Sequence, residues 1–191
     1  MSNKAMRTKA DELLSYGMPK QQVLDSVLLE FPEVKPKKVA EHLRYSATLL
    51  AKERYRGLHL SLLGLIAASA ALRVLRPVLQ DAIRMDTATA YLTLVPIASL
   101  LLGYSIYRWQ GQVFEWVGWG NVLGALGLMG AVKRVVNGGE EPWDLVMKLL
   151  SVAIGVVALY LARKVFAKPK VVKDPLGQGP ARFVFPVEGM G

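Results

Sequence analysis

The stretch TATAYLTLVPIASLLLGYSIY, residues 87–107, contains no charged side chain over its whole length. A helix needs roughly 20 mainly apolar residues to cross the ~30 Å hydrocarbon core of a bilayer. Tyr91, Tyr104, Tyr107 and Trp109 lie toward its two ends, where aromatic side chains concentrate at membrane interfaces. The stretch therefore predicts a transmembrane helix, and the chain is expected to be an integral membrane protein.

Three further segments are apolar enough to accompany it, at about residues 57–79, 113–132 and 145–162. The later two each contain a single charge near the start, Glu115 and Lys148. The first segment is free of formal charge only as far as Leu72, before Arg73 and Arg76. It either crosses the bilayer with both arginines reaching the headgroups, or it forms a re-entrant or interfacial helix.

Short connections between these segments require neighbouring helices to be antiparallel. We expect an all-α fold: a four-helix transmembrane bundle preceded by a small three-helix soluble head and followed by an extended tail. The head is residues 1–56, the transmembrane domain is residues 57–166, and the tail is residues 167–191. The tail is rich in proline and glycine and lacks helical periodicity, so it is expected to be flexible.

The head has the helix start and stop signals of a helix-turn-helix-like module. Gly17 follows a first helix at the position that favours a residue tolerant of positive φ. Pro19 and Pro36 are expected to open the second and third helices. The third helix meets no breaker before Gly57 and is expected to continue toward the membrane, with Leu50 in its buried stripe.

Composition supports a membrane class. Of the 191 residues, 52% are apolar, and the mean hydropathy is +0.29. The formal net charge is +9, and its excess lies in the segments at the two ends of the chain. The absence of cysteine excludes thiol catalysis, disulfides and thiolate metal sites.

Basic residues near the spans favour cytoplasmic N- and C-termini, because such residues resist translocation. The loops count against this orientation. The first outer loop contains three arginines, Arg73, Arg76 and Arg84, whereas the inner loop contains only Arg108. The basic residues at the termini outnumber those in the loops. The expected location is therefore the bacterial inner membrane, with both termini in the cytoplasm. The basic residues expected to contact anionic cytoplasmic lipid are Lys37, Lys38, Lys168, Lys170 and Lys173.

Small residues four positions apart allow membrane helices to approach closely. The expected packing positions are Gly120, Gly124, Gly127, Ser99, Gly103, Ser151 and Gly155. Packing within the bundle is one interpretation, and a homo-oligomer formed through the third helix is the other.

Three polar residues inside or beside the spans are candidates for function: Glu115, Asn121 and Arg73. Intramembrane ionisable groups can mark an ion path. The alternative for Glu115 is an interfacial carboxylate near a helix N-terminus, and for Asn121 it is the role of an interhelical hydrogen-bond donor.

No catalytic, cofactor or metal site is predicted. The two histidines, His42 and His59, lie on different segments without a carboxylate at ligand spacing. We expect His42 to be solvated and His59 to lie at the membrane surface. The positions expected to be exposed on the second head helix are Lys20, Gln21, Gln22, Asp25, Ser26 and Glu30. Their two carboxylates oppose phosphate, which argues against nucleic acid as a partner.

The pattern LLSYGMPKQQVLDSVLLEFP, followed by KKVAEHLR and KERYRGLHLSLLGLI, resembles small uncharacterised bacterial integral membrane proteins with an N-terminal helical head. The resemblance covers about residues 10–70. It implies an inner-membrane location and carries no activity or site residues.

The leading hypothesis is a non-enzymatic membrane protein whose cytoplasmic head and tail dock a protein partner or anchor an assembly. The alternatives are a small oligomeric transporter or channel subunit, and a membrane-tethered DNA-binding regulator.

Overall fold

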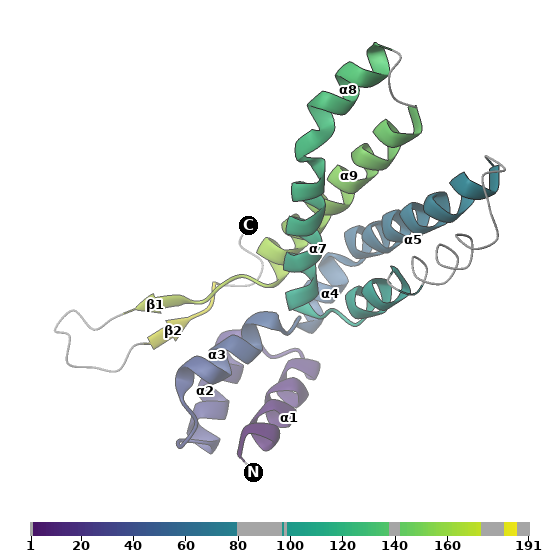
Figure 1. Ribbon diagram of the computed structural model, residues 1–191. Helices are drawn as coiled ribbons and strands as arrows, with labels where there is room; N and C mark the ends of the chain where they lie inside the picture. The colour runs from purple at the N-terminus through teal and green to yellow at the C-terminus, as the bar shows by residue number, and fades with distance from the viewer. Residues whose placement is uncertain (1, 80–96, 98, 138–141, 173–181, 187–191) are drawn as a thin grey trace. The chain divides into compact units, whose positions relative to one another are not determined.

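The computed structural model describes residues 2–79, 97, 99–137, 142–172 and 182–186 (Figure 1). This part of the chain is mostly helical, so the expected all-α class is confirmed apart from one short pair of strands. The chain divides into two compact units. Unit 1 comprises Met1–Arg56, Trp109–Gly111 and Leu161–Gly191, and unit 2 comprises Gly57–Arg108 and Gln112–Tyr160.

Unit 1 contains three helices around an apolar core: α1 (Ser2–Ser15), α2 (Lys20–Glu30) and α3 (Pro36–Tyr45). Their buried side chains recur at helical spacing, so each helix directs one face inward. The buried apolar residues of the three helices are Met6, Ala10, Leu14, Val23, Leu24, Val27, Val39, Ala40 and Leu43.

The turns of the head follow the local sequence. Gly17 has a φ of +81°, and its N–H donates to the carbonyl of Leu14 at 3.1 Å. Pro36 occupies the first turn of α3, where its missing N–H costs nothing. Pro19 is the N-cap of α2, so this helix begins one residue later than expected.

The third head helix does not continue to the membrane, and that expectation is wrong. α3 ends at Tyr45, and the separate helix α4 (Leu49–Arg54) begins after Thr48, whose hydroxyl accepts from the Ala51 N–H at 3.3 Å. A threonine that caps a new helix competes with continuation of the previous one. Leu50, expected in the buried stripe, is 54% exposed.

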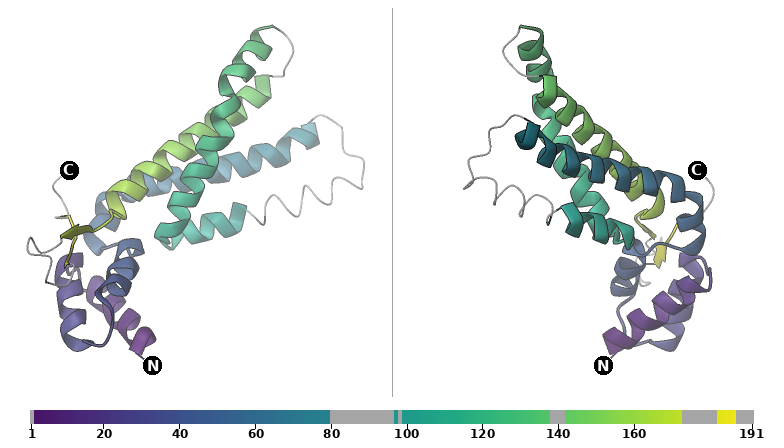
Figure 2. Two further views of the ribbon diagram at one scale, coloured as in Figure 1. Left: turned by 60° about the vertical axis from the view of Figure 1, so that its left-hand side comes forward. Right: turned by 90° about the vertical axis from the view of Figure 1, so that its right-hand side faces the viewer.

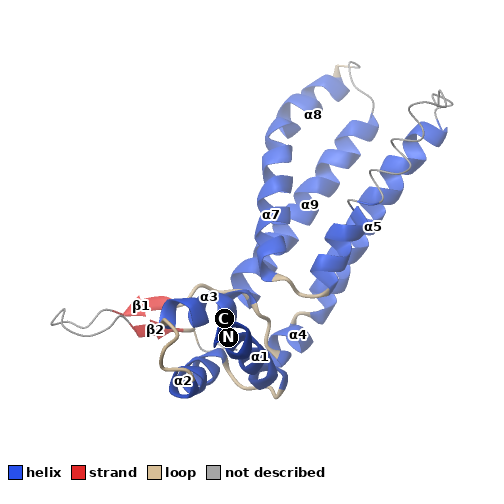
Figure 3. Cartoon of the chain, turned by 60° about the horizontal axis from the view of Figure 1, so that its bottom comes forward, coloured by secondary structure: helices blue, strands red, loops and turns tan. Residues whose placement is uncertain are grey.

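Two strands replace part of the expected flexible tail. β1 (Lys170–Val172) and β2 (Arg182–Val184) pair antiparallel, with Val171 opposite Phe183 (Figure 3). We call this pair the ribbon. Phe185 follows β2 and is 5% exposed within the core of the head. These residues are extended, as expected, but they are paired and not flexible, because burial of Phe185 offsets the entropy of ordering them.

In unit 2, two helices cover expected membrane segments and run slightly beyond them. Helix α5 (Arg56–Leu79) covers the first segment, and α9 (Pro142–Val165) covers the fourth. Residues 99–107 are helical, whereas residues 87–96 and 98 of the second segment lie outside the described part.

The third segment is not one continuous helix. It consists of α7 (Gly111–Gly124), the 3₁₀ turn η1 (Ala125–Gly127) and α8 (Leu128–Val136). Glycine is a weak helix former, and Gly124 is the last residue of α7 while Gly127 is the last residue of the 3₁₀ turn.

Two helices in the described part are long and apolar enough to cross a membrane: Arg56–Leu75 within α5 and Leu145–Val165 within α9. Their mean hydropathies are 1.8 and 2.3, and 17% and 28% of the residues in their apolar 18-residue stretches are buried. Most of their side chains are thus not covered by the rest of the described chain. The expected four-helix transmembrane bundle is not shown by these two helices.

Candidate functional site

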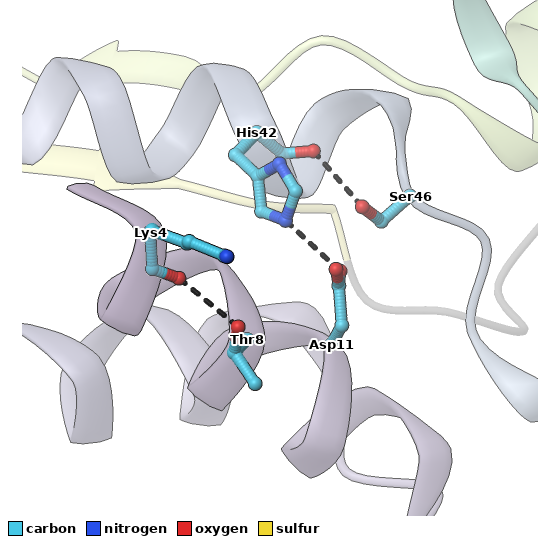
Figure 4. A network of polar contacts seen from close by, with 5 residues as sticks. All are labelled: Lys4, Thr8, Asp11, His42 and Ser46. Atoms are coloured by element: carbon cyan, nitrogen blue, oxygen red, sulfur yellow. Dashed lines mark hydrogen bonds and ion pairs between the residues drawn. The ribbon is translucent and has the colours of Figure 1, made fainter.

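A polar network joins α1 to α3 in the head (Figure 4). His42 Nε2 and Asp11 Oδ1 lie 2.9 Å apart, so His42 is paired rather than simply solvated as expected. The Ser46 hydroxyl donates to the carbonyl of His42, not to its ring, at 3.1 Å. A Ser–His–Asp relay requires the hydroxyl to meet the imidazole. This network therefore fastens two helices and does not form a nucleophile with its base.

Lys20 is buried, contrary to the expectation that it is exposed. Its side chain is on α2 and its residue is only 4% exposed. The Nζ donates to the carbonyl of Val165 at 3.0 Å and lies 5.8 Å from the ring centre of Phe166. Val165 is the last residue of α9, and a cation is favourable at a helix C-terminus. Within unit 1, Lys20 thus caps this helix end.

The neighbouring Gln21 is also engaged within unit 1. Its Oε1 accepts from the backbone N–H of Phe185 at 2.9 Å, and its Nε2 lies 3.2 Å from Asp25 Oδ1. A DNA-reading helix needs free basic and amide side chains on its outer face. Lys20 and Gln21, the cation and one of the two amides expected there, bind the protein itself instead.

His59 on α5 is covered by other residues of the protein and is 4% exposed. Its Nε2 lies 2.9 Å from the carbonyl oxygen of Ile106, and its ring is stacked on Phe114 with centres 6.2 Å apart. Ile106 is in the last turn of the helix at 99–107, where carbonyls lack helical partners. His59 therefore links the start of α5 to the end of that helix.

An interhelical hydrogen bond joins α7 and α9, which run side by side in both views of Figure 2. The Ser151 hydroxyl donates to Asn121 Oδ1 at 2.7 Å, and Asn121 Nδ2 donates to the carbonyl of Val117 at 2.8 Å. Asn121 thus makes an interhelical hydrogen bond, but as its acceptor and not as the expected donor.

Two glycines make this close contact, Gly118 and Gly155, and only Gly155 was expected to do so. A Cβ on Gly118 would lie 2.6 Å from the side chain of Leu159, and a Cβ on Gly155 would lie 3.2 Å from the Gly118 carbonyl oxygen. Of the expected positions, Ser151 and Gly155 do lie at this interface.

The other expected packing glycines do not meet a neighbour closely. A Cβ on Gly120, Gly127 or Gly103 would meet nothing within 4 Å, and one on Gly124 only the Ser151 hydroxyl at 3.9 Å. At 100° per residue, Gly120 points about 200° away from Gly118, and hence to the opposite side of α7.

An apolar groove of about 820 Å³ lies between α5 and the helix at 99–107. The groove is lined by Ala67, Ala70 and Ala71 on one side and by Ser99 and Gly103 on the other. Its described lining includes none of the three polar candidates. Glu115 is half-buried in the second turn of α7, and Arg73 is exposed on α5. This groove therefore does not bring Glu115, Asn121 and Arg73 together.

No known family model, curated protein or solved structure matches this chain. The function must therefore be argued from the residues themselves.

The described basic candidates are all exposed in unit 1. Lys37 lies 3.9 Å from Glu41, and Lys38, Lys168 and Lys170 are exposed, whereas Lys173 lies outside the described residues. Among the described residues, no group of three or more His, Asp or Glu side chains could hold a metal ion. The sites that remain are a basic ribbon and an apolar groove.

Proposed function

We propose that this chain is an integral membrane protein of the bacterial inner membrane, with four membrane helices and both termini in the cytoplasm. In this proposal it is not an enzyme, and its cytoplasmic head and ribbon dock a protein partner. Support comes from α5 and α9, because apolar helices whose side chains are mostly uncovered are suited to lipid.

The observation that carries the docking role is the ribbon. Val171 and Val172 on β1 are 53% and 51% exposed, and in the described part β1 pairs only with β2. A strand edge with exposed apolar side chains is a template on which another chain can add a strand. Lys170 and Arg182 are exposed on the same ribbon. The partner chemistry that fits is an extended apolar segment with acidic side chains.

The occupied face of α2 weakens the DNA-binding alternative. Lys20 and Gln21 are bonded within unit 1, which leaves Gln22, Asp25 and Glu30 as exposed polar side chains. Two carboxylates against one amide disfavour phosphate. Protein docking is therefore the function that the head supports best.

The topology has a direct test. Reporter fusions at Gly191, which keep Phe185 in place, are expected to fluoresce with a cytoplasmic fluorescent protein and to give no alkaline phosphatase activity. This follows because an even number of spans leaves both termini on the side rich in basic residues. High phosphatase activity would imply an odd number of spans, most simply because the segment 57–79 does not cross.

Docking on the ribbon is tested by placing a photo-crosslinking amino acid at Val171 in native membranes. A discrete protein adduct is expected there and not at Glu41, an exposed position on α3. Replacement of Val172 with glutamate should remove the adduct, because a new carboxylate repels an acidic segment and lowers strand propensity. Equal adducts at both positions, or an adduct indifferent to Val172→Glu, would overturn the docking role.

A further inference from the structure

The apolar groove beside α5 has the length of one lipid chain. It extends along α5 from Leu63 to Leu75, about 18 Å at 1.5 Å per residue. One leaflet contributes about half of the ~30 Å hydrocarbon core, roughly 15 Å. The small side chains of Ala67, Ala71 and Gly103 leave this length open. The groove can therefore accept a single acyl chain along its whole course.

A cation lies beside one end of the groove, next to its lining residues. Arg108 follows the lining residues Tyr104 and Tyr107 and is exposed. Its Nη1 donates to the Tyr104 hydroxyl at 3.3 Å, with the guanidinium 5.8 Å from the centre of that ring. Within the described residues, Arg108 forms no ion pair with a carboxylate. A guanidinium held in this way suits phosphate, which it binds with two parallel hydrogen bonds.

The contact between His59 and Ile106 fixes which end this is. It holds the last turn of the helix at 99–107 beside the start of α5, so Arg108 lies at the Leu63 end of the groove. In the proposed topology that end faces the cytoplasm. There the leaflet carries anionic lipid.

We propose that the groove binds one anionic phospholipid of the cytoplasmic leaflet, with an acyl chain between α5 and the helix at 99–107 and its phosphate on Arg108. The inference rests on the membrane location argued under Proposed function. It gives Arg108 the role of headgroup recognition and gives the alanines of α5 the role of leaving space for the chain.

The test uses the full chain in nanodiscs that contain equal amounts of phosphatidylglycerol and phosphatidylcholine with identical acyl chains. Native mass spectrometry then counts the lipids that remain bound. Wild-type protein is expected to keep one phosphatidylglycerol with about fivefold preference, the contribution of one arginine near anionic lipid. Arg108→Gln should lose the preference but still bind lipid, and Arg108→Lys should retain most of the preference.

Filling the groove should abolish retention altogether. Ala71→Phe places a ring in the groove, whereas Ala68→Phe, at an exposed α5 position outside the lining, should behave as wild type. Equal retention of both lipids by wild type, or retention unchanged in Ala71→Phe, would overturn the inference. The inference would also be overturned if the wild-type protein bound a second copy of the chain in place of lipid and Ala71→Phe lost that copy.

Alkaline carbonate extraction of the same membranes separates this inference from the membrane location. Wild-type protein that resists extraction but shows no lipid preference refutes the lipid site alone. Protein released by carbonate refutes both.

Discussion

Phe185→Ala is expected to unfold the head in the full-length protein. The ring is 5% exposed among the core residues of α1, α2 and α3, and removal of a buried phenylalanine side chain costs about 3–5 kcal/mol. The backbone N–H that donates to Gln21 is kept, so the change isolates the side chain. Hydrogen exchange at Val23 and Val27 in detergent micelles should accelerate by about a hundredfold or more.

Val184→Ala is the matched control for this change. Val184 is the preceding residue and is 41% exposed, so its truncation removes little buried area and should alter exchange by less than about tenfold. Protection at Val23 that is the same in Phe185→Ala and wild type would show that the ring is not part of the head core in solution.

Gly155→Leu is expected to separate α7 from α9. A Cβ at Gly155 would lie 3.0 Å from Val122 Cγ2 and 3.2 Å from the Val122 backbone nitrogen. Overpacking of this kind costs about 1–3 kcal/mol, and more where the obstacle is backbone. The thermal unfolding temperature in detergent should fall by about 2–4 °C for each kcal/mol lost.

Gly120→Leu provides the comparison for this helix pair. Both changes place leucine in a helix where glycine stood, so both gain about 0.8–1.0 kcal/mol of helix propensity. Only Gly155→Leu meets another backbone, because a Cβ on Gly120 has nothing within 4 Å. A larger loss in Gly120→Leu than in Gly155→Leu would mean that the contact surface of α7 is the one first expected, with Gly120 facing a neighbour.

The local sequence predicts the head well because its signals are local. Leu14, Val23, Val27, Val39 and Leu43 lie at helical spacing, and all are buried. Gly17 and Pro36 act within the turns that they end or begin. Each of these features depends on residues at most four positions away.

The burial of Lys20 and Phe185 could not be predicted from neighbouring residues. A lysine is expected at the surface because an unpaired buried ammonium is costly, and the carbonyl that receives Lys20 is 145 residues away. Phe185 lies in the short apolar run Phe183, Val184 and Phe185, but such a run does not show which face is buried. The surrounding prolines and glycines favoured a disordered interpretation.

The glycine pattern of α7 gives spacing but not direction. Gly118 and Val122 share one face, and Gly120 and Gly124 share the opposite one, at the same interval. A GxxxG pair indicates that a helix can pack closely there, and the neighbouring helix selects the face. Here α9 meets Gly118 through Leu159.

The position of Phe185 in the head core also has a consequence for biogenesis. The ribosome makes α1 to α3 first, and the roughly 130 residues from Arg56 to Phe185 take about 6–26 s more at about 5–20 residues per second. In the proposed topology the membrane helices are inserted during that time, while the apolar core of the head still lacks Phe185. The head is thus synthesised early but completes its core only after Phe185 has been made, and until then the apolar side chains that Phe185 covers are open.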